Sequence, residues 1–434
     1  MDARFYAAQV GGEIAFTVSP QPVKFGAGAL GELGADARSL GMHRVALFID
    51  PRVATTEPAA VAARALADAG IDAVPYSGIR IEPTDRSFLD AAGFAADGRF
   101  DGFVSLGGGS TIDTAKAANL LATWPDDLLT YVNAPIGRAK PVPGPLKPHI
   151  ACPTTAGTGS ETTGVAVFDL VESHVKTGIS SKWLKPALAV VDPTTTESLP
   201  AGVVACTGFD VFTHAIESFT ARPFTSRDRP ASPELRPPYQ GSNPHSDIGA
   251  MAAIRLGARY LARAVNGAAD REARHAMMFA STLAGLAFGN AGVHIPHAMS
   301  YAVAGLNHRY RACGYEDDGP MVPHGLSVVI NAPAAFRFTA EAAPERHLEV
   351  AAALGVDVRN HHPRDAGPLL AERLAAMMRE TGLPGGLAEI GYGDDAVPAL
   401  VEGAFQQQRL LTIAPRPVSR DDLAALFRAA MRYW

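Results

Sequence analysis

Short apolar runs alternate with longer amphipathic segments along the first part of the chain. The runs are hydrophobic at nearly every position, which is typical of strands buried on both faces of a sheet. Such strands are predicted at 44–50, 72–78, 101–110, 149–155 and 188–193. Helices are predicted at 57–70, 84–98 and 111–124, and a hairpin at 165–169 and 174–180. This alternation predicts a parallel sheet with helices on both faces.

The pattern changes near Thr194, after which apolar residues recur at helical spacing. Helices are predicted at 200–221, 245–267, 270–290 and 324–340, with more beyond Pro344. A single core rarely grows to 434 residues, so we expect an α/β domain over 1–195 and an all-helical domain over 196–434. A stretch rich in proline, arginine and serine, 222–246, is predicted to form a long loop.

The composition is that of an ordinary globular protein, with 47% hydrophobic and 19% charged residues. The net charge of −6 argues against nucleic acid or an anionic membrane as a partner. No run of about 18 apolar residues occurs, so no transmembrane helix is expected. The three cysteines form no CxxC pair, and the N-terminus lacks the pattern of a secretory signal. We therefore expect a cytoplasmic protein that acts on a small molecule.

Two loops rich in small residues follow predicted strands. LGGGSTIDTAK (106–116) lets the backbone approach a ligand closely and exposes the N–H groups of a helix N-terminus, which suit a pyrophosphate. CPTTAGTGSE (152–161) offers the hydroxyl groups of Thr154, Thr155, Thr158 and Ser160. Asp50 ends an apolar strand, where its carboxylate can accept hydrogen bonds from ribose hydroxyls. The alternatives are a tight strand–helix turn for the first loop, a capping turn rich in serine and threonine for the second, and an ordinary turn residue for Asp50.

Four residues of the helical part could together bind a metal ion. Asp210 and His214 are four apart on a predicted helix and share one face, although such a pair is often only a hydrogen bond. His294 and His297 lie near the end of another helical pattern, and His324 lies at a predicted helix start. Asp210, His214, His297 and His324 would form a ligand set for Zn²⁺ or Fe²⁺.

The order of these motifs resembles that of the iron-containing alcohol dehydrogenases. GGGSTIDTAK, PTTAGTGSE, VVDP, GFDVFTHAIES and PHAMSY…PHG follow the family's order between Pro22 and Arg337. The chain is most similar to the hydroxyacid–oxoacid transhydrogenase branch, through VKFGAGALGELG, DPRV, RPPYQGSNPHSD and the long spacer before MVPHGLSVV. The resemblance implies the fold shared by this family and dehydroquinate synthase, with NAD bound by 1–195 and the metal by 196–434.

The resemblance also implies roles for individual residues. It assigns Asp210, His214, His297 and His324 to the ligands of Fe²⁺ or Zn²⁺. Its cofactor-binding positions correspond to Asp50, Gly108, Gly109, Ser110, Asp113, Thr154, Thr155, Thr158, Ser160 and Lys176. The carboxylate of Asp50 stands where an acidic residue favours NAD over NADP. Tyr301 replaces a second histidine that many family members hold near the nicotinamide, so Tyr301 and His297 are the expected catalytic residues.

The implied activity is metal- and NAD-dependent hydride transfer between a small hydroxy acid or alcohol and its oxo form. In the transhydrogenase version, 4-hydroxybutyrate reduces a retained nucleotide and 2-oxoglutarate reoxidises it. Arg236 and Tyr239 in the loop 222–246 are the expected contacts of a substrate carboxylate, unless their role is structural. The alternatives are an ordinary NAD-dependent alcohol dehydrogenase or aldehyde reductase, a dehydroquinate-synthase-like lyase and a non-catalytic binding protein. The resemblance further implies a homodimer or a higher homo-oligomer.

Overall fold

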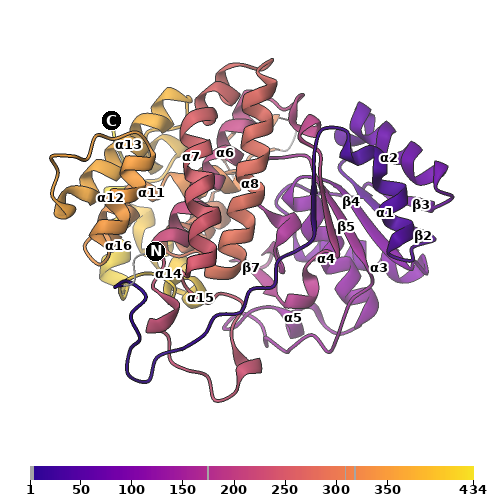
Figure 1. The fold of residues 1–434 in the computed structure, drawn as a ribbon, viewed down its shortest axis with the longest axis horizontal. Coiled ribbons are helices and arrows are strands. Elements are labelled where there is room, and N and C mark those ends of the chain that lie inside the picture. The colour runs from indigo at the N-terminus through magenta and orange to yellow at the C-terminus, as the bar shows by residue number, and fades with distance from the viewer. Residues whose placement is uncertain (1–3, 174, 308, 317–318) are drawn as a thin grey trace. The chain divides into compact units, whose positions relative to one another are not determined.

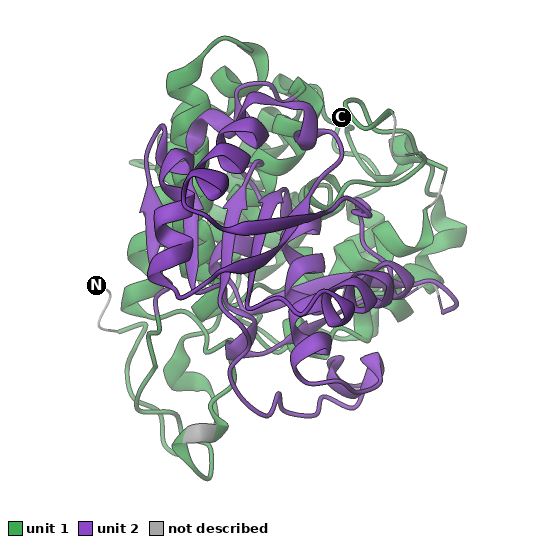
Figure 2. Cartoon of the chain, turned by 90° about the vertical axis from the view of Figure 1, so that its right-hand side faces the viewer, with its two compact units in different colours: residues 1–19, 200–434 green, residues 20–199 purple. Residues whose placement is uncertain are grey.

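The computed structural model describes residues 4–173, 175–307, 309–316 and 319–434, and the chain forms two compact units (Figure 2). One unit is Pro20–Leu199, and the other joins Met1–Ser19 to Pro200–Trp434. Residues 1–19 therefore belong with Pro200–Trp434, although in sequence they precede the unit Pro20–Leu199. The predicted division into domains 1–195 and 196–434 stays a prediction.

The unit Pro20–Leu199 contains a six-stranded parallel sheet (Figure 1). Its strands, in spatial order, are β1 (Val23–Phe25), β8 (Leu188–Val191), β5 (His149–Pro153), β4 (Gly102–Gly107), β2 (Arg44–Ile49) and β3 (Asp72–Tyr76). Its helices are α1 (Leu33–Ser39), α2 (Glu57–Asp68), α3 (Asp85–Asp97), α4 (Gly109–Thr123) and α5 (Leu128–Tyr131). The parallel α/β fold is confirmed, and only the short strand β1 lies outside the predicted strands.

Alternate residues of β2 face opposite layers of helices. Val45, Leu47 and Ile49 share a buried cluster with residues of α1 and α2. Ala46 and Phe48 point the other way and pack with residues of α3 and α4. Side chains of a strand alternate between the two faces of a sheet, so helices on both faces bury every position. This is why the strand is an unbroken apolar run in the sequence.

The strand register brings the expected nucleotide residues to one edge of this sheet. Ile49 pairs with Leu106 across β2 and β4, and Gly107 pairs with Pro153 across β4 and β5. Three features follow these positions at the carboxyl ends of their strands: Asp50, the glycine loop (within 106–116) and the threonine loop (within 152–161). The predicted hairpin is also present as the antiparallel pair β6 (Val165–Leu170) and β7 (Val175–Ser180), while His174 lies outside the described residues.

All regular elements in the described part of the other unit are helices. They are α6 (Ala201–Thr220), α7 (Pro244–Asn266), α8 (Arg271–Ala291), α9 (Ile295–Leu306), α10 (His324–Val329), α11 (Ala332–Thr339), α12 (Pro344–Ala353), α13 (Ala366–Glu380), α14 (Val397–Phe405), α15 (Gln408–Leu411) and α16 (Arg420–Ala429). The single helix predicted over 324–340 is wrong. It is divided into α10 and α11 because Pro333 has no N–H and its ring clashes with a preceding helical turn.

The helix α6 is buried on all sides between α7, α8 and α10. Every residue from Gly208 to Thr220 is buried, including acidic and imidazole side chains. A helix that lies inside a core is normally apolar all round, so these polar side chains need a specific reason.

In the described part of the chain, no single helix is long and apolar enough to cross a membrane. The pair α8 and α9, bent by 103°, meets that test by length and composition only.

Candidate metal centre and nucleotide loops

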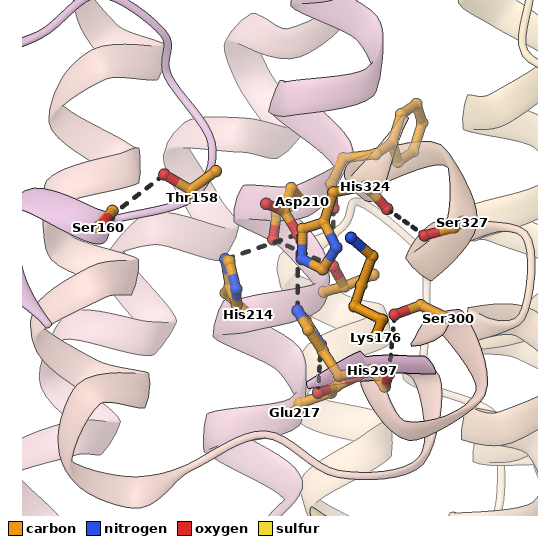
Figure 3. A network of polar contacts seen from close by, with 12 residues as sticks. Thr158, Ser160, Lys176, Asp210, His214, Glu217, His297, Ser300, His324 and Ser327 are labelled. Carbon is orange, nitrogen blue, oxygen red and sulfur yellow. Dashed lines mark hydrogen bonds and ion pairs between the residues drawn. The ribbon is translucent and has the colours of Figure 1, made fainter. Parts of the chain in front are cut away.

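The helix α6 carries two of the four expected metal ligands. Asp210 and His214 lie one helical turn apart, and Nδ1 of His214 is 3.8 Å from Oδ1 of Asp210 (Figure 3). Both side chains are almost fully buried. The spacing of four residues thus places a carboxylate and an imidazole on one face of a core helix.

Two other helices bring the remaining expected ligands to the same carboxylate. Nε2 of His297, in the first turn of α9, lies 3.6 Å from Oδ1 of Asp210. Nε2 of His324, the first residue of α10, lies 3.8 Å from the same oxygen. A Cβ atom at Gly325 would lie only 2.0 Å from the carbonyl oxygen of Cys206, so glycine lets α10 begin close against α6. One ligand atom from each of the four residues lies within 4.8 Å of all the others.

The expected position of His294 and His297, near the end of a helix, is wrong. These histidines are at the start of a new helix and not at the end of the preceding one. The helix α8 ends at Gly292, whose φ of +95° is accessible mainly to glycine. His294 is the residue before α9, and Pro296 occupies the first turn, where its missing N–H is not needed.

Three of the converging atoms are buried and have no hydrogen-bond partner among the described residues: Oδ1 of Asp210, Nδ1 of His214 and Nε2 of His297. Buried polar atoms are nearly always paired, so three together require an explanation. Tetrahedral ligands about 2.1 Å from a metal lie roughly 3.4 Å apart. The separations of 3.6–3.8 Å from Asp210 are close to that value. The four residues therefore fit a divalent cation, and their O and N donors suit Zn²⁺ or Fe²⁺.

Burial and neighbouring charges set the protonation of this cluster. Burial lowers the pKa of His214 to about 3, so at neutral pH its ring is uncharged and offers a lone pair. Burial raises the pKa of Asp210, but the histidines, with His214 the largest contributor, hold it well below its usual range. Burial lowers the pKa of His297, but the carboxylates of Glu217 and Asp210 outweigh burial and raise it to about 9.

Glu217 is a buried carboxylate beside the metal cluster that the sequence analysis did not single out. Its Oε2 accepts hydrogen bonds from Nδ1 of His297 at 2.7 Å and from the backbone N–H of His294 at 2.8 Å. Its Oε1 accepts one from the backbone N–H of His297 at 3.1 Å. When a metal ion takes the place of the proton on Nε2 of His297, the bond to Glu217 would keep the remaining proton on Nδ1. Glu217 is three residues after His214 and seven after Asp210, so helical spacing alone could have indicated it.

His294 and Tyr301 are close to the metal cluster in sequence, and both are buried. His294 is fully buried, and its Nε2 lies 3.1 Å from Oγ1 of Thr220. It is not among the four residues whose ligand atoms converge. Tyr301 is also buried and follows His297 by one turn of α9, so the two side chains share a helix face.

The glycine loop meets the predicted requirements for a close-approaching ligand. Gly108 precedes the first residue of α4, where backbone N–H groups are free of intrahelical bonds. A Cβ at Gly109 would lie 2.6 Å from Oγ1 of Thr158, and one at Gly108 would lie 3.3 Å from Thr155. The glycine loop and the threonine loop are therefore packed together at this edge of the sheet. Their partly exposed residues, which suit a phosphate, are Gly108, Gly109, Ser110, Thr155 and Thr158.

Asp113 and Ser160 join the two loops through a buried network. The hydroxyl of Ser160 donates to Oδ1 of Asp113, and the backbone N–H of Val167 donates to Oδ2 at 2.9 Å. The ammonium group of Lys116 donates to Ser160 and to the carbonyl of Val165, each at 2.7 Å. Thr154 is also buried and donates its backbone N–H to Gly107. In this unit these residues hold the loops in place, and direct cofactor contact by them stays a prediction.

Lys176 and Asp50 each pair with an oppositely charged residue. The ammonium group of Lys176 lies 2.6 Å from Glu82 and 3.0 Å from Asp169. Burial lowers the pKa of Lys176, but these carboxylates outweigh it and raise the pKa above its usual range. Asp50 binds the guanidinium of Arg52, with Oδ2 2.8 Å from Nη2.

Arg236 and Tyr239, the expected substrate contacts, are engaged in packing the loop 222–246. The guanidinium of Arg236 donates to both carboxylate oxygens of Glu13, at 2.8 and 3.1 Å. Tyr239 is buried and packs closely against Gly292, where an added Cβ would lie 2.9 Å from the Cβ of Tyr239. The guanidinium carbon of Arg409 is 4.9 Å from the centre of the tyrosine ring. A substrate role for Arg236 stays a prediction, and it would have to compete with Glu13.

Comparisons with known proteins identify similar sequences and structures. Residues 20–193 match the family model of iron-containing alcohol dehydrogenases, and residues 239–431 match that family's C-terminal model. The chain is 50% identical over 424 residues to the Bos taurus protein named hydroxyacid-oxoacid transhydrogenase, mitochondrial, covering 97% of this chain and 91% of that one.

Two solved structures are similar over nearly the whole chain. A 1,3-propanediol oxidoreductase is 28% identical with a TM-score of 0.84, covering 96% of this chain and 100% of that one. Sulfoacetaldehyde reductase from Bifidobacterium kashiwanohense in complex with NAD⁺ is 25% identical with a TM-score of 0.76, covering 96% and 99%. These matches confirm the two-part fold that the sequence predicts.

The expected cytoplasmic location is contradicted by these comparisons. The Bos taurus relative, which matches 97% of the chain, is named as a mitochondrial protein. The expectation rested on cysteine usage and the absence of a secretory signal. Unpaired cysteines indicate a reducing compartment, but they do not show which reducing compartment it is.

Proposed function

The chain belongs to the iron-containing alcohol dehydrogenase family of oxidoreductases, and from this premise we propose that it transfers hydride from a small hydroxy acid to an oxo acid. The observation that supports this function best is the convergence of Asp210, His214 and His297 through buried atoms without hydrogen-bond partners among the described residues. A purely structural cluster would leave the free energy of these desolvated atoms uncompensated.

Asp210, His214, His297 and His324 would hold the metal. A divalent cation there supplies a Lewis acid that polarises an alcohol or carbonyl oxygen. His324 is the most exposed of the four, with 23% of its side chain accessible, while the others are nearly buried. Glu217 would hold a proton on Nδ1 of His297 and thereby leave Nε2 as the atom that binds the metal.

Tyr301 is proposed to make proton transfer in this enzyme differ from that in alcohol dehydrogenases with histidine at this position. A phenol titrates near pH 10 and stays neutral where a histidine would take up a proton. Tyr301 can therefore orient a substrate oxygen by a hydrogen bond but is a poor proton acceptor at pH 7. Transhydrogenation suits such a residue, because the proton released by the hydroxy acid is consumed when the oxo acid is reduced.

The glycine and threonine loops would bind the nucleotide, whose nicotinamide accepts and returns the hydride. Gly108 and Gly109 leave room for a pyrophosphate at the N-terminus of α4. The network of Asp113, Lys116 and Ser160 would keep both loops in that shape before the nucleotide arrives. Such preorganisation lowers the entropic cost of binding.

The transhydrogenase reaction is tested with protein that has been freed of loosely bound nucleotide by gel filtration. We expect 4-hydroxybutyrate and 2-oxoglutarate to give succinate semialdehyde and 2-hydroxyglutarate in equal amounts without added NAD. Omitting the oxo acid should stop turnover after one equivalent per site. Continued turnover without an oxo acid, driven by added NAD, would contradict the proposal.

An ordinary NAD-dependent dehydrogenase is the second candidate, and it is supported by the likeness to a sulfoacetaldehyde reductase that was crystallised with NAD⁺. In that case, NADH would accumulate in proportion to added NAD over many turnovers. The two candidates share the metal set and the loops, and they differ in whether the nucleotide leaves between half-reactions.

We also propose a homodimer or a higher homo-oligomer for this chain. Light scattering coupled to size-exclusion chromatography checks this directly, since one chain has a mass of 45.4 kDa.

A further inference from the structure

Asp50 and Arg52 lie where the nucleotide loops begin, and together they point to an unexpected cofactor specificity. The backbone N–H of Asp50 donates to the carbonyl of Leu106, one residue before the glycines start. We infer that Arg52, and not Asp50 alone, contacts the adenosine ribose of the nucleotide. The pair would then accept a 2′-phosphate as well as a 2′-hydroxyl. NADP(H) would then bind to this protein alongside NAD(H).

The carboxylate of Asp50 has little capacity left to bind a ribose. Its Oδ1 accepts from the backbone N–H of Arg52 at 2.8 Å and from Nε of Arg52 at 3.0 Å. Its Oδ2 accepts from Nη2 of Arg52 at 2.8 Å. A carboxylate offers about four lone-pair positions, and the backbone N–H of Val53 also hydrogen-bonds to Asp50, so little capacity remains. An acidic residue that holds both ribose hydroxyls needs two, and Asp50 cannot provide them while Arg52 is bound.

The charge of Asp50 is also balanced. An isolated carboxylate rejects a 2′-phosphate because two anions would lie in contact. Here the guanidinium lies against the carboxylate with two parallel N–H···O contacts, so the pair has no net charge.

The cation is the accessible member of the pair. The side chain of Arg52 is 46% exposed and that of Asp50 only 10%. A ligand approaching this strand end therefore meets the guanidinium before the carboxylate. The planar guanidinium has five N–H donors in a fork that matches phosphate oxygens, so it can bind a 2′-phosphate while still contacting Asp50.

This inference requires only that the family's nicotinamide nucleotide binds at these loops, and it holds whether the nucleotide is retained or exchanged. It is tested by titrating charcoal-treated protein with NADH and with NADPH and following nucleotide fluorescence. The wild-type dissociation constants should lie within about tenfold of each other. Arg52→Ala should weaken NADPH by about tenfold or more and NADH by less than about threefold, because only NADPH loses a charge-assisted contact.

Two further variants make the result specific. Arg64→Ala removes the same charge from the same unit, where Arg64 pairs with Glu57 on α2 at 2.8 Å, and it should alter neither affinity. Arg52→Lys keeps the charge but not the fork, so its NADPH affinity should fall between those of wild type and Arg52→Ala. A wild-type preference for NADH well beyond tenfold would overturn the inference. Equal weakening of both nucleotides by Arg52→Ala would overturn it as well.

Discussion

Single atoms decide the chemistry of the metal centre. Oδ1 of Asp210 faces imidazole nitrogens from three helices, and a cation is the simplest species that satisfies all of them. The buried surroundings of Asp210 cannot solvate an ionised carboxylate as water does. Without a cation, the cluster would therefore lower the stability of the fold. The proposed metal binding would account for these four side chains, which a purely stabilising role does not.

His297→Ala and Tyr301→His should separate metal binding from substrate chemistry. The first removes a ligand, so the purified variant should hold less than about a tenth of the wild-type metal. The second keeps all four ligands and should hold the wild-type amount while its rate changes. Elemental analysis of both variants checks this. A full metal content in His297→Ala would contradict the ligand assignment.

Glu217→Gln should weaken metal binding although it changes a single atom. Glu217 accepts three hydrogen bonds through two oxygens, whereas glutamine has one carbonyl oxygen and one NH₂ group. Whichever way the amide turns, its NH₂ group meets an N–H donor. We expect the metal affinity to fall about 10- to 100-fold in a chelator competition assay.

Glu13→Gln is the matched control for Glu217→Gln, because it makes the same change at another buried carboxylate of the same unit. Its metal affinity should stay at the wild-type value. The Co²⁺-loaded Glu217→Gln protein should also show shifted visible absorption bands, which loss of stability alone would not produce. Unchanged affinity and an unchanged spectrum would remove Glu217 from this role.

At the scale of elements, the nucleotide loops depend on the close contact between the start of α4 and the threonine loop. Gly109→Ala would place a methyl group 2.6 Å from Oγ1 of Thr158 and 3.0 Å from its Cβ. Threonine is stiff at this position because it is β-branched, so the loop itself must shift. We expect nucleotide affinity to fall about tenfold or more while the metal content is unchanged.

Gly93→Ala is the control for the glycine loop, since Gly93 lies within α3 and a Cβ there meets nothing within 4 Å. Its nucleotide affinity should equal that of wild type in the same fluorescence titration. If Gly109→Ala also bound normally, the loop would not approach the nucleotide as proposed.

The N-terminal segment is joined to the loop 222–246 by ionic and backbone contacts. Hydrogen bonds from Arg236 lower the pKa of Glu13 to about 2. The backbone N–H of Glu13 donates to Arg227 at 2.7 Å, and that of Thr17 donates to the side-chain oxygen of Gln240 at 2.8 Å. These contacts explain why the first 19 residues belong to the helical unit.

The stabilisation from Glu13 should depend on pH in a defined direction. Its folded pKa lies below its unfolded value near 4.5, so the folded state binds this proton less tightly. The contribution is complete above about pH 5 and is lost as the pH falls toward about 2. The difference in melting temperature between wild type and Glu13→Gln should therefore shrink over this range. A difference that stays constant down to pH 2 would exclude the ion pair as its cause.

At the scale of the whole molecule, the metal should link function to stability. The proposed site would bind the metal only in the folded chain, so removing the metal should lower the melting temperature. At a metal concentration about 1,000 times the dissociation constant, the loss is about 4 kcal/mol. Calorimetry with chelator and after adding back Fe²⁺ or Zn²⁺ checks this. His214→Ala should melt at one temperature under all these conditions.

The parallel sheet, the helical second part and the Asp210–His214 pair could be predicted because each depends on local spacing. A strand buried on both faces is an apolar run, and residues i and i+4 of a helix share a face. The break between α10 and α11 and the start of α9 were predicted wrongly. There the apolar pattern continues through Pro333 and Gly292, although the backbone changes direction.

The sequence by itself determined the α/β and helical division, the family and the four candidate metal residues, because these are encoded by periodicity and by motifs of neighbouring residues. Only the tertiary structure showed that Glu217 supports His297, that Arg52 balances Asp50 and that Glu13 engages Arg236. The partners of Glu217 and Glu13 are 80 and 223 positions away in the chain. Arg52 is near Asp50 in sequence, but its side-chain direction depends on the folded strand end. Spacing along a chain predicts which residues share a face, and folding decides which charges meet.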